Sequence, residues 1–324
     1  DPARYRSKYG NGADHHHYVE VGRKLGYECT RGQHLRRLLI TEILPKFQEF
    51  TEKSGRAHMF LEIGPFVNPM LLGEGVKYFE VMDLPKLKER AEHIGYPLKN
   101  PVNIDYVHPT GDLLDAIHHR QAFSLIASSN VLPHQLDLVG HLQAVGELLI
   151  EGGYYAMVLA DKRYMIDHFL PETSIADVLD DHYGNRRGAS SHKMRSVIEH
   201  RALTVHSDAQ LHWAKQHGAK FRSPDDFVDR VKTSIKEYNQ AKEQNNYVDV
   251  HNYHFTPQSL AFIVDTLFNL ELTNVRVHRL YDPLTGEFEF GIVLKKCSQV
   301  VVEEVAEKGG ASDATVSANS SATS

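Results

Sequence analysis

The sequence has little cysteine, no long apolar run and no cluster of basic residues. Cys29 and Cys297 are the only cysteines among 324 residues, which excludes a disulfide-rich scaffold and is typical of a reducing compartment. No apolar run approaches the roughly 20 residues of a membrane span, and no charged-then-apolar leader is present. The formal charge of −6 is spread along the chain, unlike a nucleic-acid-binding face. We therefore expect a cytoplasmic protein with no membrane or nucleic-acid partner.

Histidine, in contrast, is abundant, with 21 residues in the chain. The run His15–His17 could bind a metal ion, but no nearby cysteine or carboxylate spacing completes a site. A solvated N-terminal segment is the favoured interpretation, and the sequence assigns no metal ligand there.

Apolar periodicity divides the chain into five parts. We expect an N-terminal arm and helix, a core, a helical insertion, a return to the core sheet and a disordered low-complexity tail, in the ranges 1–55, 56–160, 161–248, 249–297 and 298–324. The apolar stripe over Gln33–Lys53 predicts the N-terminal helix, which could also contact a second copy of the chain in a homodimer.

Strand-like and helix-like segments alternate through the core. The predicted strands are Met59–Ile63, Tyr78–Met82, Val102–Val107, Phe123–Ala127 and Tyr154–Ala160, and the predicted helices are Leu84–Ile94, Gly111–His119 and Leu136–Leu149. Gly152 and Gly153 are expected to end the last of these helices. This alternation predicts an α/β fold with a doubly wound, mainly parallel sheet.

The second half of the chain completes the expected sheet. Its predicted helices are Ile175–His182, Lys193–Gln216, Asp225–Asn245 and Pro257–Phe268, the last with Thr256 as N-cap. Two strands follow, Thr273–Arg279 and Glu287–Lys295, joined by the turn Asp282–Gly286. The predicted fold is therefore a seven-stranded sheet ending in an antiparallel hairpin, with a helical insertion after the fifth strand and an N-terminal helical extension.

The segment FLEIGPFVNP (Phe60–Pro69) predicts a buried strand followed by a glycine turn. Dinucleotide-binding loops keep a second glycine so that the backbone can approach a pyrophosphate. Phe66 stands at that place, and Pro69 stands where the third glycine would be. The sequence therefore favours a nucleoside cofactor without phosphates.

Together with three further segments, this one resembles the class I S-adenosylmethionine-dependent methyltransferases. The other segments are EVMDLP (Glu80–Pro85), HPTGDLLD (His108–Asp115) and FSLIASSNVLPHQLD (Phe123–Asp137) followed by LLIEGGYYAMVLA (Leu148–Ala160). The resemblance implies S-adenosylmethionine as cofactor and S-adenosylhomocysteine as product.

The resemblance also implies roles for individual residues. Glu62 and Gly64 would organise the first loop and the methionine part, and Asp83 would bind the ribose hydroxyls. The remaining cofactor-binding candidates are Asp112 and Leu113 beside the adenine and Ser129 and Asn130 near the methyl group. Helix capping is the alternative for Glu62 and for Asp83, which precedes a helix starting at Pro85. A packed or loop-orienting role is favoured for His134.

Two polar segments, 161–184 and 249–257, are expected to serve the methyl acceptor because both return to the carboxyl edge of the sheet. His251 is the predicted base, with Asp167 and His168 as further catalytic residues. The predicted acceptor-binding residues are Arg163, Tyr164, His182, Tyr253 and His254. A charged surface loop and solvent-facing histidines remain the alternatives, and a metal held by His251 and His254 is not favoured.

The predicted function is methyl transfer from S-adenosylmethionine to a hydroxyl of a sugar or another small polar metabolite. The polar segment 161–184 also resembles bacterial sugar-modifying methyltransferases. Two alternatives remain: an NAD-dependent reductase or epimerase of the same fold class, against which Phe66 and the closing hairpin argue, and a catalytically inactive cofactor-binding partner subunit.

Overall fold

The computed structural model describes residues 59–186, 191–220 and 223–297. The predicted N-terminal helix Gln33–Lys53, the run His15–His17 and the tail 298–324 lie outside these ranges. Within them, no helix is both long enough and apolar enough to cross a membrane.

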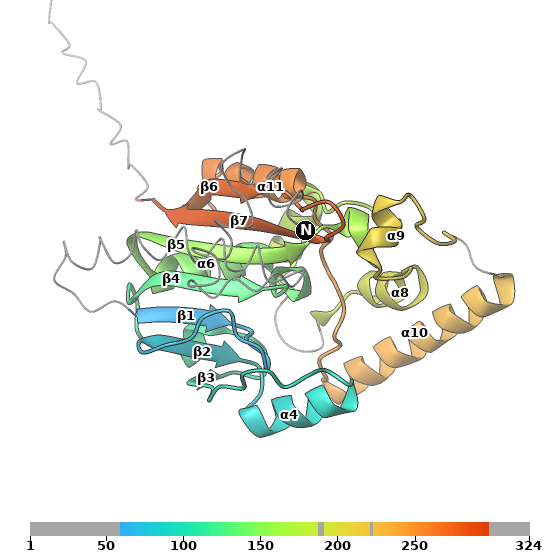
Figure 1. Cartoon of the computed structure of the whole chain (residues 1–324), viewed down its shortest axis with the longest axis horizontal. Helices are drawn as coiled ribbons and strands as arrows, with labels where there is room; N and C mark the ends of the chain where they lie inside the picture. The colour runs from blue at the N-terminus through green and yellow to red at the C-terminus, as the bar shows by residue number, and fades with distance from the viewer. Residues whose placement is uncertain (1–58, 187–190, 221–222, 298–324) are drawn as a thin grey trace, which may run out of the picture.

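A seven-stranded sheet in the order β3-β2-β1-β4-β5-β7-β6 forms the centre of the fold (Figure 1). β1 to β5 run parallel to one another, and β7 is antiparallel to both β5 and β6. The strands are β1 (Met59–Ile63), β2 (Val76–Glu80), β3 (Tyr106–Val107), β4 (Phe123–Ser129), β5 (Leu149–Ala160), β6 (Val275–Tyr281) and β7 (Glu289–Lys296). The predicted fold class, with its closing antiparallel hairpin, is confirmed.

Eight α-helices and two short 3-10 helices accompany the sheet in the described ranges. They are α4 (Leu84–His93), α5 (Leu113–Ala116), η2 (Leu132–His134), α6 (Leu138–Leu148), η3 (Lys162–Tyr164), α7 (Ile175–Tyr183), α8 (Met194–Ala202), α9 (Ala209–Trp213), α10 (Pro224–Gln244) and α11 (Pro257–Asn269). The strand arrows of β1 and β4 point toward the side on which α8 and α10 lie (Figure 1). The helices α7 to α10 follow β5 in the chain and precede the closing hairpin, so the predicted helical insertion after the fifth strand is confirmed.

The main core lies between the sheet and the helices α6 and α11. Leu142 and Val145 of α6, and Leu260 and Val264 of α11, pack with buried strand residues such as Met157. The central strands are apolar on both faces: Phe123–Ser129 is buried at its first six positions. Strands buried on both faces are typical of parallel sheets covered by crossover connections.

Three sequence predictions about the elements are wrong. Gly152 and Gly153 do not end a helix but lie inside β5, which begins at Leu149; Gly152 takes φ +74°, next to a register shift in the pairing with β4. The expected strand Val102–Val107 is reduced to Tyr106–Val107. The expected helix Lys193–Gln216 is split into α8 and α9, because the Asp208 side chain accepts hydrogen bonds from two backbone N–H groups and starts a new helix.

Two helix starts follow the predicted capping chemistry. Thr256 caps α11 and Ser174 caps α7, each through a capping box in which side chain and backbone exchange hydrogen bonds. Pro257 occupies the first turn of α11, where its missing N–H costs nothing.

A buried polar chain links α6 to the sheet. His141 Nε2 lies 3.0 Å from Tyr155 Oη, which lies 2.8 Å from Ser128 Oγ. Burial lowers the pKa of His141 to about 4, so the folded protein holds this imidazole neutral.

This histidine should make the protein acid-sensitive. Between pH 6.5 and 4, His141 is protonated in the unfolded chain but neutral in the folded protein. As the pH falls through this range, the free energy of unfolding should therefore decrease by about 3 kcal/mol from this group alone. Urea titrations of the wild type and of His141→Gln from pH 4.5 to 7.5 measure this slope. The slope should be smaller by about one proton in the variant, and equal slopes would contradict the assignment.

Candidate active site

A pocket of about 620 Å³ lies at the carboxyl ends of the parallel strands. Its wall is formed by the turn after β1, the end of β2, the start of α5 and the segment after β4, in the ranges 64–66, 80–82, 111–114 and 129–131. Open α/β sheets bind ligands at this edge, and the volume suits a ligand of nucleoside size.

The turn after β1 is held by Glu62 and requires glycine at position 64. Glu62 is 1% exposed, and its two carboxylate oxygens accept hydrogen bonds from Met70 N and Leu71 N, both at 2.8 Å. Gly64 has φ +69°, and a Cβ there would lie 2.5 Å from Val131 Cγ2. Both residues line the pocket; the predicted contact of Glu62 with a cofactor amino group stays a prediction.

Phe66 occupies the turn with φ 51°, which few non-glycine residues adopt. Its backbone N–H donates to Glu80 Oε1 at 2.8 Å, and its ring meets the Tyr96 ring edge-on at 5.3 Å. The aromatic side chain therefore fills the space that a second glycine leaves open in dinucleotide sites.

Glu80, rather than Asp83, presents its carboxylate at the end of β2. Glu80 is 8% exposed and lines the pocket, and burial raises the pKa of its carboxyl despite hydrogen bonds from Phe66 N and Val81 N. Asp83 is exposed, does not line the pocket and caps α4 by accepting from Lys86 N. The Asp83 side chain performs the capping role that the sequence left as the alternative, and its predicted contact with the ribose stays a prediction.

The other cofactor-binding candidates all line the pocket: Asp112, Leu113, Ser129 and Asn130. Asp112 is exposed and also caps α5, because its Oδ1 accepts from Leu114 N and Asp115 N. Asn130 follows β4 with φ 55°, and its buried Oδ1 has no hydrogen-bond partner among the described residues. A buried amide oxygen of this kind needs a partner, and a ligand in the pocket can supply one.

A histidine–carboxylate pair also faces the pocket. His134 Nδ1 lies 3.0 Å from Asp249 Oδ1, and Asp249 forms an ion pair with Arg90. All three residues line the pocket. The His134 hydrogen bond, followed by the charges of His134 and Arg90, holds the pKa of Asp249 well below its usual range. The sequence favoured a packing role for His134, so this pairing was missed.

His251 and Asp167 form a second pair behind the first. His251 Nδ1 lies 2.6 Å from Asp167 Oδ2, and the His251 ring meets the His134 ring edge-on at 4.8 Å. Burial raises the pKa of Asp167, but the hydrogen bond from His251 and nearby histidine charges outweigh it and lower that pKa overall. Neither residue is in the wall of this pocket, and the role of His251 as the base stays a prediction.

The remaining acceptor candidates also lie away from the pocket wall. Arg163 pairs with buried Asp161, and Tyr164 stacks on Trp213 at 4.2 Å. His182 binds Asp137, while Tyr253 and His254 are 1% and 5% exposed. The third catalytic candidate, His168, stacks on His217 at 3.7 Å. These contacts occupy the side chains within the protein, and their direct contacts with an acceptor stay predictions.

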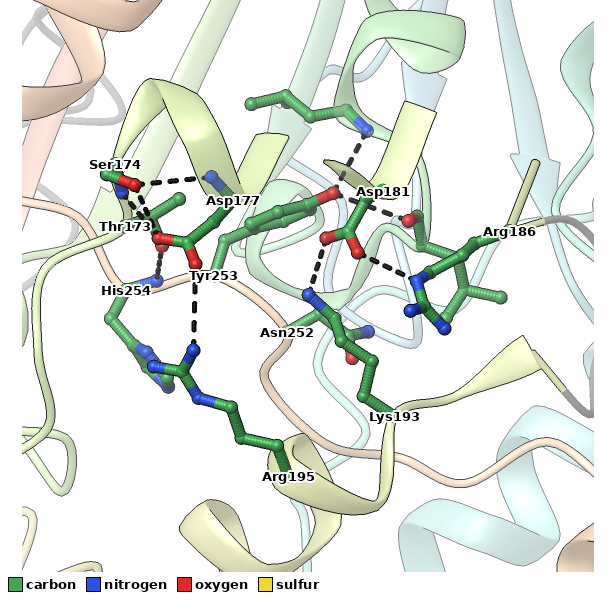
Figure 2. A network of polar contacts seen from close by, with 12 residues as sticks. Thr173, Ser174, Asp177, Asp181, Arg186, Lys193, Arg195, Asn252, Tyr253 and His254 are labelled. Atoms are coloured by element: carbon green, nitrogen blue, oxygen red, sulfur yellow. Dashed lines mark hydrogen bonds and ion pairs between the residues drawn. The ribbon is translucent and has the colours of Figure 1, made fainter. Parts of the chain in front are cut away.

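The insertion reaches the pocket through Arg186 and Tyr247. Fully buried Asp181 anchors Arg186, with Oδ1 2.9 Å from Arg186 Nε and Oδ2 2.6 Å from Lys193 Nζ (Figure 2). In the same view, Tyr253 lies directly beside this carboxylate. The network therefore fixes the position of Arg186 at the rim.

The charge of the pocket wall is dominated by carboxylates. Six acidic residues line it: Glu62, Glu80, Asp112, Asp137, Glu147 and Asp249. The arginines in the wall, Arg90 and Arg186, are each already paired with a carboxylate. The wall is therefore suited to a cationic ligand and opposes an anionic one.

No protein-family model and no curated protein matches the chain. Among solved structures, a SAM-dependent methyltransferase from Aquifex aeolicus is similar over 76% of this chain and 88% of its own, at 10% identity and a TM-score of 0.32. A putative S-adenosylmethionine-dependent methyltransferase from Listeria monocytogenes is similar over 78% of this chain and 99% of its own, at 11% identity and a TM-score of 0.37. A putative Zn-dependent alcohol dehydrogenase from Rhodobacter sphaeroides is similar over 78% of this chain and 89% of its own, at 11% identity and a TM-score of 0.38. The activity has to be argued from the site itself.

Proposed function

We propose that the protein transfers a methyl group from S-adenosylmethionine to a hydroxyl of a small polar acceptor such as a sugar. The observation that carries this proposal is the acidic pocket at the carboxyl edge of the sheet, with Glu80 at the end of β2. The sulfonium and ammonium groups of this cofactor outweigh its single carboxylate, so its net charge is positive. The pyrophosphate of NAD is anionic and would enter a pocket whose wall holds six carboxylates and Phe66.

The wall offers a partner for each part of this cofactor. Glu80 is the acceptor for the ribose hydroxyls, since a buried carboxylate makes charge-assisted hydrogen bonds. Asp112 and Leu113 are assigned to the adenine, and the turn at Gly64 to the methionine part. The methyl group would then point toward Asn130 and His134.

The pair of His134 and Asp249 is suited to accept the hydroxyl proton. We assign the proton of His134 to Nδ1, which lies 3.0 Å from Asp249 Oδ1, so that Nε2 is left with the lone pair that accepts a proton. With the cofactor bound, the acceptor oxygen would bond to the methyl carbon as the carbon–sulfur bond breaks, and the hydroxyl proton would move to His134 Nε2. Sulfur leaves as the neutral thioether of S-adenosylhomocysteine, so the step needs no metal ion.

Behind this pair, His251 and Asp167 serve as positioning residues. The edge-on contact at 4.8 Å supports the orientation of the His134 ring. Arg186 and Tyr247 are the residues through which the insertion would contact the acceptor.

A crystal structure with S-adenosylhomocysteine tests these assignments. We expect the ribose hydroxyls within hydrogen-bond distance of Glu80 and the sulfur on the side of Asn130 and His134. The proposal fails if the ligand binds elsewhere, or if its ribose contacts Asp83 instead.

A further inference from the structure

Three histidine rings meet outside the pocket, at the junction of the insertion and the core. His168 follows η3, His212 belongs to α9 and His217 follows α9. One ring nitrogen from each lies within 4.8 Å of the others. None of the three lines the pocket, so this histidine cluster is separate from the proposed methyl-transfer site.

Backbone carbonyls fix the tautomers of two of these rings. His168 Nδ1 lies 2.7 Å from Arg163 O, and His212 Nε2 lies 3.0 Å from His206 O. A carbonyl oxygen only accepts hydrogen bonds, so both of these nitrogens carry protons. The lone pairs of the neutral rings are then on His168 Nε2 and His212 Nδ1. Metal-ligating histidines share this arrangement, in which the second ring nitrogen donates to a carbonyl or carboxylate.

The third ring brings its nitrogen to the same place. His212 is 2% exposed, and its Nδ1 accepts a hydrogen bond from His217 Nδ1 at 3.0 Å, a bond that a shared metal ion would replace with release of the His217 proton from that nitrogen. Two nitrogen ligands of one zinc ion, each bound at about 2.0–2.1 Å, lie roughly 3 Å apart or slightly more. His217 is half-buried and stacked on His168, so its ring has to turn to share an ion with it.

Neighbouring contacts already join the two segments that would share the ion. Trp213, next to His212, stacks on Tyr164 with 4° between the rings and donates from Nε1 to Glu287 O at 2.8 Å. The histidine cluster is therefore supported by packing that holds α9 against η3 without a metal.

A second group of potential ligands, Asp167, His200 and His251, fits a metal ion less well. His251 Nδ1 donates to Asp167 Oδ2 at 2.6 Å, which is short for two ligands of one ion. His200 Nδ1 accepts from His251 N, so a neutral His200 carries its proton on Nε2. Asp167 Oδ2 and His200 Nδ1 are thus already engaged in hydrogen bonds within the group.

We propose that His168, His212 and His217 bind a zinc ion that fastens the segment around α9 to the segment after η3. Three imidazoles are typical ligands of a four-coordinate zinc ion whose fourth position is open to water, and the partial exposure of His168 and His217 admits water here. None of the three ligands lines the pocket, so this ion is distinct from the proposed methyl-transfer chemistry.

The test uses the full chain with His15–His17 replaced by alanine, since that run would also bind zinc. The metal-free protein is titrated with Zn²⁺ against a competing indicator, and with Co²⁺ followed by visible absorption. We expect one equivalent of tightly bound Zn²⁺ and the strong visible bands of four-coordinate Co²⁺. His217→Ala and His168→Gln should weaken binding by more than about 100-fold, beyond the typical effect of an outer-sphere change.

Two matched variants serve as controls. The ring nitrogens of His206 already contact Gln216 O and Asp208 N, so His206→Ala removes an adjacent imidazole that is not a ligand. His251→Ala removes a ligand of the alternative group. Both should retain one equivalent of Zn²⁺, and Zn²⁺ should raise the Tm of both but not of His217→Ala.

Three results would overturn the proposal. They are the absence of a bound equivalent in the parent protein, a loss of binding in His251→Ala with retention in His217→Ala, and equal losses in His206→Ala and His217→Ala. Because the readout is metal binding rather than methyl transfer, failure here leaves the proposed function untouched.

Discussion

Replacing Glu80 by glutamine should weaken the binding of S-adenosylmethionine by about 10- to 100-fold. A hydrogen bond to a charged group contributes roughly 1 kcal/mol more than one between neutral groups, and two ribose hydroxyls are involved. Glutamine keeps the size of the side chain but also turns an N–H donor toward the Phe66 N–H or the ribose. Isothermal titration calorimetry of the wild type and of Glu80→Gln measures the change.

Asp83→Asn is the matched control for this substitution. Asp83 is exposed, and asparagine caps a helix about as well as aspartate, so the affinity should stay within about 2-fold of the wild type. A larger loss in Asp83→Asn than in Glu80→Gln would restore Asp83 as the ribose-binding residue and contradict the assignment made from the pocket wall.

The cofactor affinity of the wild type and of Glu80→Gln should also depend differently on pH. Burial raises the pKa of Glu80, so this carboxyl takes up a proton at a higher pH than an exposed glutamate does. The wild type should therefore lose cofactor affinity as the pH falls toward the mildly acidic range, whereas Glu80→Gln should be insensitive there. Titrations from pH 5 to 8 check this.

Replacing His134 by glutamine should lower kcat for a hydroxyl acceptor by about 10²- to 10⁴-fold, the usual contribution of a general base. The affinity for S-adenosylmethionine should change little, because the base acts on the acceptor. Formation of S-adenosylhomocysteine with a panel of sugars and polyols measures the rate, and binding is measured separately by calorimetry.

Two comparisons make this second result specific. His119 is exposed and outside the pocket wall, so His119→Gln should leave kcat unchanged. An acceptor whose hydroxyl is already ionised at the assay pH should be far less sensitive to His134→Gln, since no proton has to be removed. Equal loss with ionised and neutral acceptors would contradict the role of His134 as the base.

Several residues of the pocket wall could be selected from the sequence because each follows from a short local pattern. Glu62 and Gly64 come directly from the strand–turn pattern, and Ser129 and Asn130 from the end of a recognisable strand. EVMD contains two acidic residues three positions apart, Glu80 and Asp83, and the sequence alone does not show which of them reaches the pocket wall. Pairing with β1, in which Ile63 lies opposite Phe79, ends β2 at Glu80, and a single strand's sequence does not contain that register.

The acceptor half was not predictable from local pattern. His134 and Asp249 are far apart in the sequence and meet only after the chain returns from the insertion. His251 and Asp167 were both selected, and the structure does bring them together, but one layer behind the pocket. Tyr253 and His254 have the residue types of a binding site, but both side chains are buried, and His254 N donates to Thr173 Oγ1. This burial depends on contacts with segments that are distant in the sequence.

The central claim, that this pocket binds S-adenosylmethionine, is tested most directly by calorimetry of the purified protein with S-adenosylmethionine, S-adenosylhomocysteine and NAD⁺ in parallel. We predict saturable binding of the first two at one site in each chain, with no heat from NAD⁺. Binding of NAD⁺, together with no binding of either sulfur-containing ligand, would contradict the account.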